Sequence, residues 1–360
     1  MLLLCILNLD VNWFYFENLI SDKMFNKFIA SILPYFPKKF IWIFSKSYVS
    51  GETIEDAMRV AKELNHGRVM VTFDILGEFI KTLDEAAENK KDYLNLIDVA
   101  HKSGIDGNFS VKPTSFGLLI DKEACYRYIR EIVSKAASYN SFIRIDMEDS
   151  PCTDLEIELF RRLKTEFPGN VGLVLQAYLK RTLNDIKSLE DLNSEKYPLN
   201  FRLCKGIYVE SETIAYKKYE EINQHYLEDL EYMLRNKIYV GIATHDKPLV
   251  DGAYKLIAKY NVPKNMYEFQ MLYGVTPGLR QSIVDDGHRM RVYVPYGVDW
   301  FGYCTRRLKE NPKMASQIIK AIFVKGLQSL HFRIPFDSRY LWCNCSTSCR
   351  VRFGFMAEGF

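Results

Sequence analysis

The sequence lacks the short motifs that mark several common enzyme classes. No GxGxxG turn follows its first strand-like segment, and it has no GxxxxGK[ST] loop, so neither a Rossmann nor a P-loop nucleotide site is predicted. It also has no GxSxG nucleophile elbow, and no second histidine or carboxylate lies at metal-ligand spacing from His245. A serine-hydrolase triad and a bound metal are therefore not expected.

A strong charge of either sign is also missing. The net charge of the 360 residues is +3, and no predicted helix concentrates lysine and arginine, so a nucleic-acid partner is not expected. The eight cysteines are scattered and lie mostly in apolar runs, which is typical of buried thiols in a reducing compartment. We therefore expect a cytoplasmic protein whose 48% hydrophobic residues can fill a large core.

The N-terminal segment is apolar but lacks the pattern of a signal peptide or a membrane span. No basic region precedes MLLLCILNLDVNWFYF, no small-residue cleavage site follows it, and Asp10 interrupts it early. Pro34 and Pro37 break a second apolar stretch. We expect residues 1–47 to form an N-terminal helical arm, and a peripheral contact with the inner membrane stays open.

A regular alternation of strand-like and helix-like segments begins near Arg68. The expected strands are residues 68–75, 108–112, 142–147, 171–177, 200–206, 238–244, 266–272 and 289–295. A helix is expected after each strand, and the longest, residues 212–236, follows the fifth. Eight such units in series are typical of an α/β fold of the (β/α)₈ TIM-barrel type, which we place at residues 48–325. Residues 326–360 lack this periodicity and form an atypical C-terminal tail.

Polar residues collect at the C-terminal ends of the expected strands, where barrel enzymes hold their active sites. They are Asp74, Glu78, Lys112, Asp146, Gln176, Arg202, Lys205, Thr244, His245, Gln270 and Tyr293. Buried charges without partners are costly, so polar groups at nearly every strand end indicate a functional site.

The expected mouth of the barrel is cationic and suits an anionic ligand. Arg306 and Arg307 lie on the helix after the last strand, and the planar guanidinium fork matches a carboxylate. The alternative is that these two cations only oppose the dipole at a helix C-terminus. Lys112, Lys205 and Arg202 add positive charge, and Glu78 and Asp146 are the obvious counter-charges.

These residues leave three functional alternatives open. The first is an enzyme that binds a phosphate-bearing cofactor together with a small acid, in which His245 is a general base, a phosphate contact or a structural residue. Lys112 or Lys205 can serve as the Schiff-base nucleophile of a barrel aldolase. A degenerate barrel that binds without catalysis is the third alternative.

Seven segments, in this order, closely resemble the monofunctional bacterial proline dehydrogenases: FDILGEF, IRIDMEDSP, LQAYL, FRLCKGIYVE, ATHD, YEFQMLYGV and YVPYGVDWFGYCTRRL. The resemblance covers roughly residues 48–323. It implies a distorted (β/α)₈ barrel that holds FAD non-covalently. It also implies the first step of proline catabolism, in which L-proline is oxidised to Δ1-pyrroline-5-carboxylate by hydride transfer to flavin N5. Electrons would then pass to a membrane quinone.

The same resemblance implies roles for individual residues. Arg306, Arg307 and Lys112 would hold the proline carboxylate, and Tyr293 would pack on the proline ring. Asp146 and Arg202 match active-site positions, with Arg202 close to flavin N5. Glu78 matches a residue that pairs with one of the arginines and gates the site. Contacts with FAD are implied for Met147, Gln176, Lys205, Gly206, Ile207, Thr244 and His245.

Overall fold

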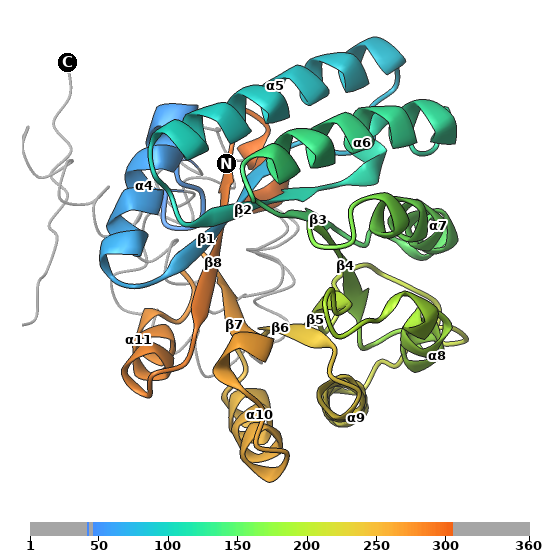
Figure 1. Ribbon diagram of the computed structural model, residues 1–360, viewed down its shortest axis with the longest axis vertical. Helices are drawn as coiled ribbons and strands as arrows, with labels where there is room; N and C mark the ends of the chain where they lie inside the picture. The colour runs from blue at the N-terminus through green and yellow to red at the C-terminus, as the bar shows by residue number, and fades with distance from the viewer. Residues whose placement is uncertain (1–41, 43–45, 305–360) are drawn as a thin grey trace, which may run out of the picture.

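The computed structural model describes residue 42 and residues 46–304. In this part of the chain, eight parallel strands close into a barrel in chain order, and helices surround it (Figure 1). The predicted (β/α)₈ fold is thereby confirmed. The C-terminal tail and nearly all of the N-terminal arm lie outside the described residues, so the predictions made for them stay predictions.

The strands are β1 Met70–Ile75, β2 Gly107–Val111, β3 Ile143–Ile145, β4 Val171–Gln176, β5 Asn200–Cys204, β6 Tyr239–Ala243, β7 Tyr267–Leu272 and β8 Met290–Tyr296. The α-helices are α4 Ile54–His66, α5 Leu83–Lys102, α6 Lys122–Ser138, α7 Ser150–Glu166, α8 Thr182–Ser188, α9 Tyr219–Arg235, α10 Lys247–Lys259 and α11 Pro277–Asp285. Short 3-10 turns are η2 Pro113–Phe116, η3 Glu190–Leu192 and η4 Lys264–Met266. None of the described helices combines the length and the apolarity needed to cross a bilayer.

Local capping explains where two of the predicted helices begin. The Thr82 hydroxyl accepts the N–H of Glu85 and donates to the Glu85 carboxylate, which is a capping box at the start of α5. Asp121 accepts the N–H groups of Glu123 and Ala124 at the start of α6. Both helices therefore start within a residue or two of their predicted positions.

The longest predicted helix is shorter than expected. It begins at Tyr219 rather than near Glu212. The preceding residues form a loop that is hydrogen-bonded to the β4–α8 connection. Tyr216 N–H donates to the Tyr178 carbonyl at 2.8 Å, and Ala215 forms a β-bridge with Leu179. These contacts between distant segments override the local helical pattern.

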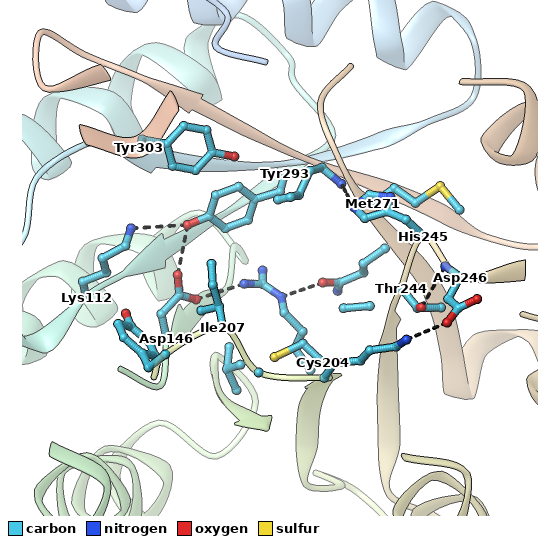
Figure 2. A pocket seen from close by; sticks show the side chains of 18 of the residues that line it. Lys112, Asp146, Cys204, Ile207, Thr244, His245, Asp246, Met271, Tyr293 and Tyr303 are labelled. Carbon is cyan, nitrogen blue, oxygen red and sulfur yellow. Dashed lines mark hydrogen bonds and ion pairs between the residues drawn. The ribbon is translucent and has the colours of Figure 1, made fainter. Parts of the chain in front are cut away.

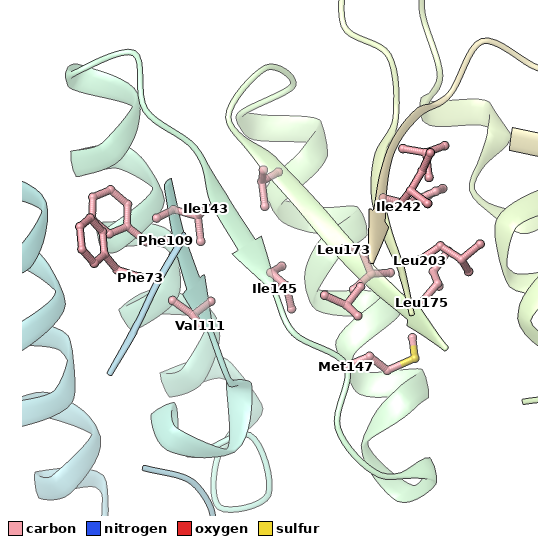
Figure 3. Close-up of a cluster of buried hydrophobic side chains, with 14 of the residues drawn as sticks. Phe73, Phe109, Val111, Ile143, Ile145, Met147, Leu173, Leu175, Leu203 and Ile242 are labelled. Atoms are coloured by element: carbon pink, nitrogen blue, oxygen red, sulfur yellow. The ribbon is translucent and has the colours of Figure 1, made fainter. Parts of the chain in front are cut away.

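Side chains alternate between the two faces of the barrel wall, as the two-residue period of a strand requires. Phe73, Phe109, Val111, Ile143 and Ile145 are buried in the apolar layer of the fold, part of which is shown in Figure 3. The residues between them are polar and bond across the barrel interior: Thr72 to Asn108, Ser110 to Asp146, and Arg202 to Gln270. The hydrophobic core is thus in the outer layer, and the interior holds hydrogen-bonded polar groups.

Paired charges fill the N-terminal end of the barrel. Arg291 donates to Glu268 at 2.7 and 3.2 Å and to the Val71 carbonyl at 2.8 Å. Burial alone would raise the pKa of Glu268, but the charge and hydrogen bonds of Arg291 outweigh it and bring the pKa to about 2. Arg144 donates to the backbone and side-chain oxygens of Asn200, and burial lowers its pKa to about 9. These groups close the bottom of the barrel.

Candidate active site

A cavity of about 800 Å³ lies at the C-terminal ends of the strands. Many of the residues predicted for the site line it: Glu78, Lys112, Asp146, Arg202, Lys205, Gly206, Ile207, Thr244, His245 and Tyr293. Its volume is large enough for a cofactor together with a small ligand. The strand-end residues therefore meet in one place, as the predicted (β/α)₈ barrel requires.

Lys112 follows β2 and is held by a carboxylate from the neighbouring strand. Its Nζ lies 2.7 Å from both side-chain oxygens of Asp74, which is 1% exposed on β1. Burial would lower the pKa of Lys112, but the charges of Asp74 and Asp146 outweigh burial and raise it. Lys112 is therefore a fixed positive charge at neutral pH.

Asp146, which directly follows β3, lines the cavity together with Arg202 of β5 and Tyr293 of β8. Figure 2 labels Asp146 and Tyr293. Arg202 Nη1 donates to Asp146 Oδ1 at 2.9 Å, and the Tyr293 hydroxyl donates to Asp146 Oδ2 at 3.0 Å. Burial and the charge of Asp146 raise the pKa of Tyr293 well above its ordinary value, so the phenol stays protonated. Lys112 Nζ lies 3.4 Å from the same hydroxyl. Tyr293 thus links the two charged pairs.

Gln270 on β7 fixes the other side of Arg202. Its Oε1 accepts from Arg202 Nε at 2.6 Å, while its Nε2 donates to Glu268 at 2.7 Å. The bond to Glu268 decides which end of the amide faces Arg202. Arg202 Nη2 is buried and has no hydrogen-bond partner within the described part of the chain. This guanidinium therefore has one donor that the described residues leave unused.

A second charged pair lies at the opposite side of the cavity. Lys205 Nζ and the Tyr219 hydroxyl each lie 2.5 Å from Asp246 Oδ2. Burial opposes the shift, but these two hydrogen bonds lower the pKa of Asp246. The Lys205 ammonium also lies 4.3 Å from the centre of the Tyr219 ring. The pair offers a cation and an aromatic face to a ligand.

His245 is anchored by the backbone of β7. Its Nε2 accepts the N–H of Leu272 at 3.2 Å, and its Nδ1 lies 3.4 Å from the Thr276 hydroxyl. An accepting Nε2 implies that the ring proton is on Nδ1. Among the described residues, no group of three or more His, Cys, Asp or Glu side chains is arranged to hold a metal ion.

Comparison with known proteins places this cavity in a family. The model of the proline dehydrogenase family matches residues 57–320, which span every strand of the barrel. The chain belongs to the proline dehydrogenase family. Proline dehydrogenase 1 of Bacillus subtilis subsp. natto is 36% identical over 281 residues, covering 78% of this chain and 91% of that protein. Proline dehydrogenase of Deinococcus radiodurans is 34% identical over 314 residues, covering 85% and 99%.

Solved structures of larger proteins contain a similar barrel. Proline utilization A (PutA) from Bdellovibrio bacteriovorus, inactivated by N-propargylglycine, superposes with a TM-score of 0.72 and 27% identity. The match covers 80% of this chain but only 36% of that PutA chain. PutA of Bradyrhizobium japonicum, at 21% identity and a TM-score of 0.64, shares the fold.

Two residues assigned by resemblance to the proline dehydrogenase family, Met147 and Gln176, are not among the residues that line the cavity. Met147 packs in the hydrophobic cluster (Figure 3). Gln176 is buried and donates to the Glu148 carbonyl. Arg306 and Arg307 lie outside the described residues. Their roles stay predictions.

Gly206 has a steric reason to be glycine. Its φ is +109°, and a Cβ there would lie 2.1 Å from Cδ1 of Tyr178. The sequence predicted a close approach of a ligand at this glycine. The Tyr178 ring lies on the side where a Cβ would project, and the approach of a ligand stays a prediction.

Several cavity or supporting residues had no assigned role. Asp74, Ser110 and Gln270 alternate with apolar core residues along their strands, and this alternation was the signal that they face inward. Tyr208 and Tyr303 also line the cavity of this proline dehydrogenase family member. Tyr208 comes from a loop and Tyr303 from the segment after β8, so no strand periodicity marked them.

Proposed function

We propose that this protein oxidises L-proline to Δ1-pyrroline-5-carboxylate, with FAD as the hydride acceptor. The observation that carries the proposal is the linked cluster of Lys112, Tyr293, Asp146 and Arg202 inside a large cavity. In a chain of the proline dehydrogenase family, this cluster provides positive charge for a small carboxylate beside space for a flavin.

The residues present fit a flavin. Arg202 Nη2 is a buried donor without a partner among the described residues, and it belongs to a side chain that lines the cavity. Lys205, Gly206, Ile207, Thr244 and His245 line the same cavity, and with Met147 and Gln176 they would hold the cofactor. When bound, FAD supplies the acceptor for the hydride, and a fixed guanidinium stabilises the negative charge that results.

The substrate carboxylate would meet the cations on the Lys112 side. Lys112 is held rigidly by Asp74, so it can orient a carboxylate without losing side-chain entropy at that moment. Arg306 and Arg307 are proposed to complete the clamp. The Tyr293 ring would pack on the proline ring, and Glu78, which lines the cavity, would act as the gate.

Charges of both signs act on the substrate amine. A hydride leaves the carbon next to nitrogen only when the nitrogen lone pair is available, so the amine must be neutral. Lys112 and Arg202 act to lower the pKa of a bound secondary amine, whereas Asp74 and Asp146 act to raise it. Asp146 accepts hydrogen bonds from Arg202, Ser110 and Tyr293, which keeps its carboxylate in place.

The aldolase alternative is not supported by the geometry. A Schiff-base nucleophile must be a neutral amine, yet Lys112 is paired with Asp74 and has a raised pKa. Lys205 is paired with Asp246. Neither lysine is prepared to attack a carbonyl, and the family match favours proline oxidation over both this alternative and a degenerate barrel.

We also propose that the protein is cytoplasmic, that electrons leave to a membrane quinone, and that the protein touches the inner membrane peripherally. Phe79, Ile207, Val209 and Val298 are exposed in the loops that follow β1, β5 and β8. These loops surround the cavity, so their apolar side chains support a membrane contact near the site.

An absorption spectrum of the purified protein, recorded before and after anaerobic addition of proline, tests the proposal. We expect a flavin band that proline bleaches. A flavin that proline leaves oxidised would contradict the substrate, and a colourless protein that FAD cannot reconstitute would contradict the cofactor. Anaerobic addition of glycine, which lacks the pyrrolidine ring, is the control.

A further inference from the structure

Glu148 is a buried carboxyl group just behind the cavity wall. It lies in the β3–α7 connection, two residues after Asp146, and is 1% exposed. Thr114 of η2 donates to it twice: its N–H lies 2.9 Å from Oε2, and its hydroxyl lies 2.5 Å from Oε1. Two hydrogen bonds from one residue fix the orientation of both side chains.

The same turn holds the loop that carries Glu78. The Thr114 hydroxyl accepts the N–H of Phe79 at 3.1 Å. The hydroxyl of the next residue, Ser115, donates to the Gly77 carbonyl at 2.7 Å. The backbone is therefore held immediately before and immediately after Glu78, which lines the cavity.

The backbone of Glu148 extends the connection to the other side of the cavity. Its carbonyl accepts from Gln176 Nε2 at 2.9 Å, and its N–H donates to Glu156 Oε1 at 3.0 Å. One residue thus joins the loops that follow β1, β2 and β3 to the end of β4.

The charge of Glu148 is balanced within this group. Burial raises its pKa to about 7, while the hydrogen bonds from Thr114 and the charge of Lys112 act in the opposite direction. Burial and the charge of Glu148 raise the pKa of Glu156 well above its ordinary value. Glu78 and Lys112 are the cavity charges that act on Glu148.

We propose that Glu148 is a positioning residue that, through Thr114, holds the Glu78 loop against the cavity, and through its own backbone holds Asp146 and Gln176. The role of Glu78 as a gate rests on the proposed function. The mechanical link does not, because it follows from the hydrogen bonds alone. Loss of the link frees the loop and leaves the barrel intact.

Thr114→Val tests the link, because valine keeps the shape and the N–H but removes the hydroxyl that bridges Glu148 and Phe79. Lys81 is exposed in the same loop, so trypsin cleavage after Lys81 reports loop opening without any need for activity. We expect this cleavage to be about tenfold faster in Thr114→Val, the effect of one lost hydrogen bond on a local opening equilibrium. Cleavage after Lys196, exposed in a distant loop, should not change.

Thr114→Ser keeps the hydroxyl and is the matched control, with cleavage and kinetics close to the wild type. The KM for proline should rise about tenfold in Thr114→Val with little change in kcat, since only the closed loop is destabilised. Ser115→Ala, which removes the bond to Gly77, should shift cleavage after Lys81 in the same direction. Glu148→Gln, which turns one of the two acceptors of Thr114 into a donor, provides a second variant should Thr114→Val not fold.

Equal cleavage after Lys81 in Thr114→Val, Ser115→Ala and the wild type would overturn the proposal. Faster cleavage with an unchanged KM would keep the mechanical link but overturn the part that concerns the gate. Failure of proline to bleach the wild-type flavin would contradict the proposed function, and the cleavage result would still stand.

Discussion

At the N-terminal end of the barrel, the protein itself provides partners for Arg291: Glu268 accepts from two of its nitrogens and the Val71 carbonyl from the third. At the C-terminal end, Arg202 is equally well held by Asp146 and Gln270, yet its Nη2 is buried without a partner in the described chain. Both arginines lie in the barrel interior, but only Arg202 lines the cavity.

This difference separates structural charge from functional charge. A buried ion pair whose hydrogen bonds are completed within the protein contributes to the fold, and removal of one partner leaves an uncompensated charge. For Arg202, a buried cation with an unused donor beside a cavity, we propose that a ligand provides the missing partner. Among the described residues, Arg144 also has a nitrogen without a partner, but it does not line the cavity, so an unused donor alone does not mark a site.

The most direct test of this difference between the two ends of the barrel is Arg202→Met. We expect kcat/KM for proline to fall about 10²–10³-fold, the usual effect of losing one fixed group that stabilises developing charge. The melting temperature should change by only a few degrees, because Asp146 keeps Ser110 and Tyr293 as partners. Arg59→Met on the exposed face of α4 is the control and should leave both quantities unchanged. A large loss of stability with activity retained would show that Arg202 has a structural role instead of a functional one.

Arg291→Leu should give the opposite result. Glu268 would stay buried without its main counter-charge, which destabilises a protein by about 3–5 kcal/mol. Chemical denaturation should show this loss, and the melting temperature should fall by roughly 10 °C. The kcat/KM of the protein that remains folded should stay within a few fold of the wild type, since Gln270 still donates to Glu268. A double variant with Glu268→Leu should recover part of the stability.

Asp229 on α9 extends the comparison, because it is a buried carboxyl group that belongs to neither end of the barrel interior. It is 3% exposed, its Oδ2 has no partner among the described residues, and burial raises its pKa from 3.8 to about 7. The native state therefore binds a proton that the unfolded chain releases, so its stability falls as the pH rises from about 4 to about 7.

Asp229→Asn removes this titration. Its stability relative to the wild type should grow over that pH range by roughly 3 kcal/mol and stay constant above it. Denaturant titrations at pH 5 and pH 8 measure the difference. Glu220→Gln, an exposed position on the same helix that does not act on Asp229, is the control. An equal difference at both pH values would show that Asp229 is ionised throughout.

The smallest effect is expected for Tyr293→Phe. Phenylalanine keeps the ring, whose centre lies 5.2 Å from the Arg202 guanidinium carbon, but loses the hydroxyl between Lys112 and Asp146. A hydrogen bond to a charged group contributes about 1.5–3 kcal/mol, so kcat/KM should fall about 10- to 100-fold. Tyr126→Phe, which removes a surface hydroxyl bonded to Glu166, is the matched control and should have no effect on kinetics.

Sequence periodicity predicted the fold and the position of the site. The eight strands lie where short apolar runs were found, because each strand buries one face in the apolar layer between barrel and helices. The cluster of Lys112, Asp146, Arg202 and Tyr293 followed from their places at strand ends, since parallel strands in a closed barrel bring those ends together.

Contacts that depend on loops were not predictable in the same way. The start of α9 at Tyr219 depends on backbone bonds to Tyr178 and Leu179. The bonds between Thr114, Glu148 and Phe79 join three connections that are far apart in sequence. No local pattern encodes such pairings, because they depend on how the loops pack after the barrel has closed.

A redesign of this cavity for another amino acid would have to include residues that lie beneath the cavity, toward the N-terminal end of the barrel. The amide of Gln270 presents its oxygen to Arg202 because its nitrogen is held by Glu268, which Arg291 also binds. A substitution at Glu268 would free the amide to turn, so that its nitrogen and the Arg202 guanidinium would face each other as two donors beside the cavity. A library restricted to cavity-lining positions would omit this residue, so the variable set should include the bottom of the barrel.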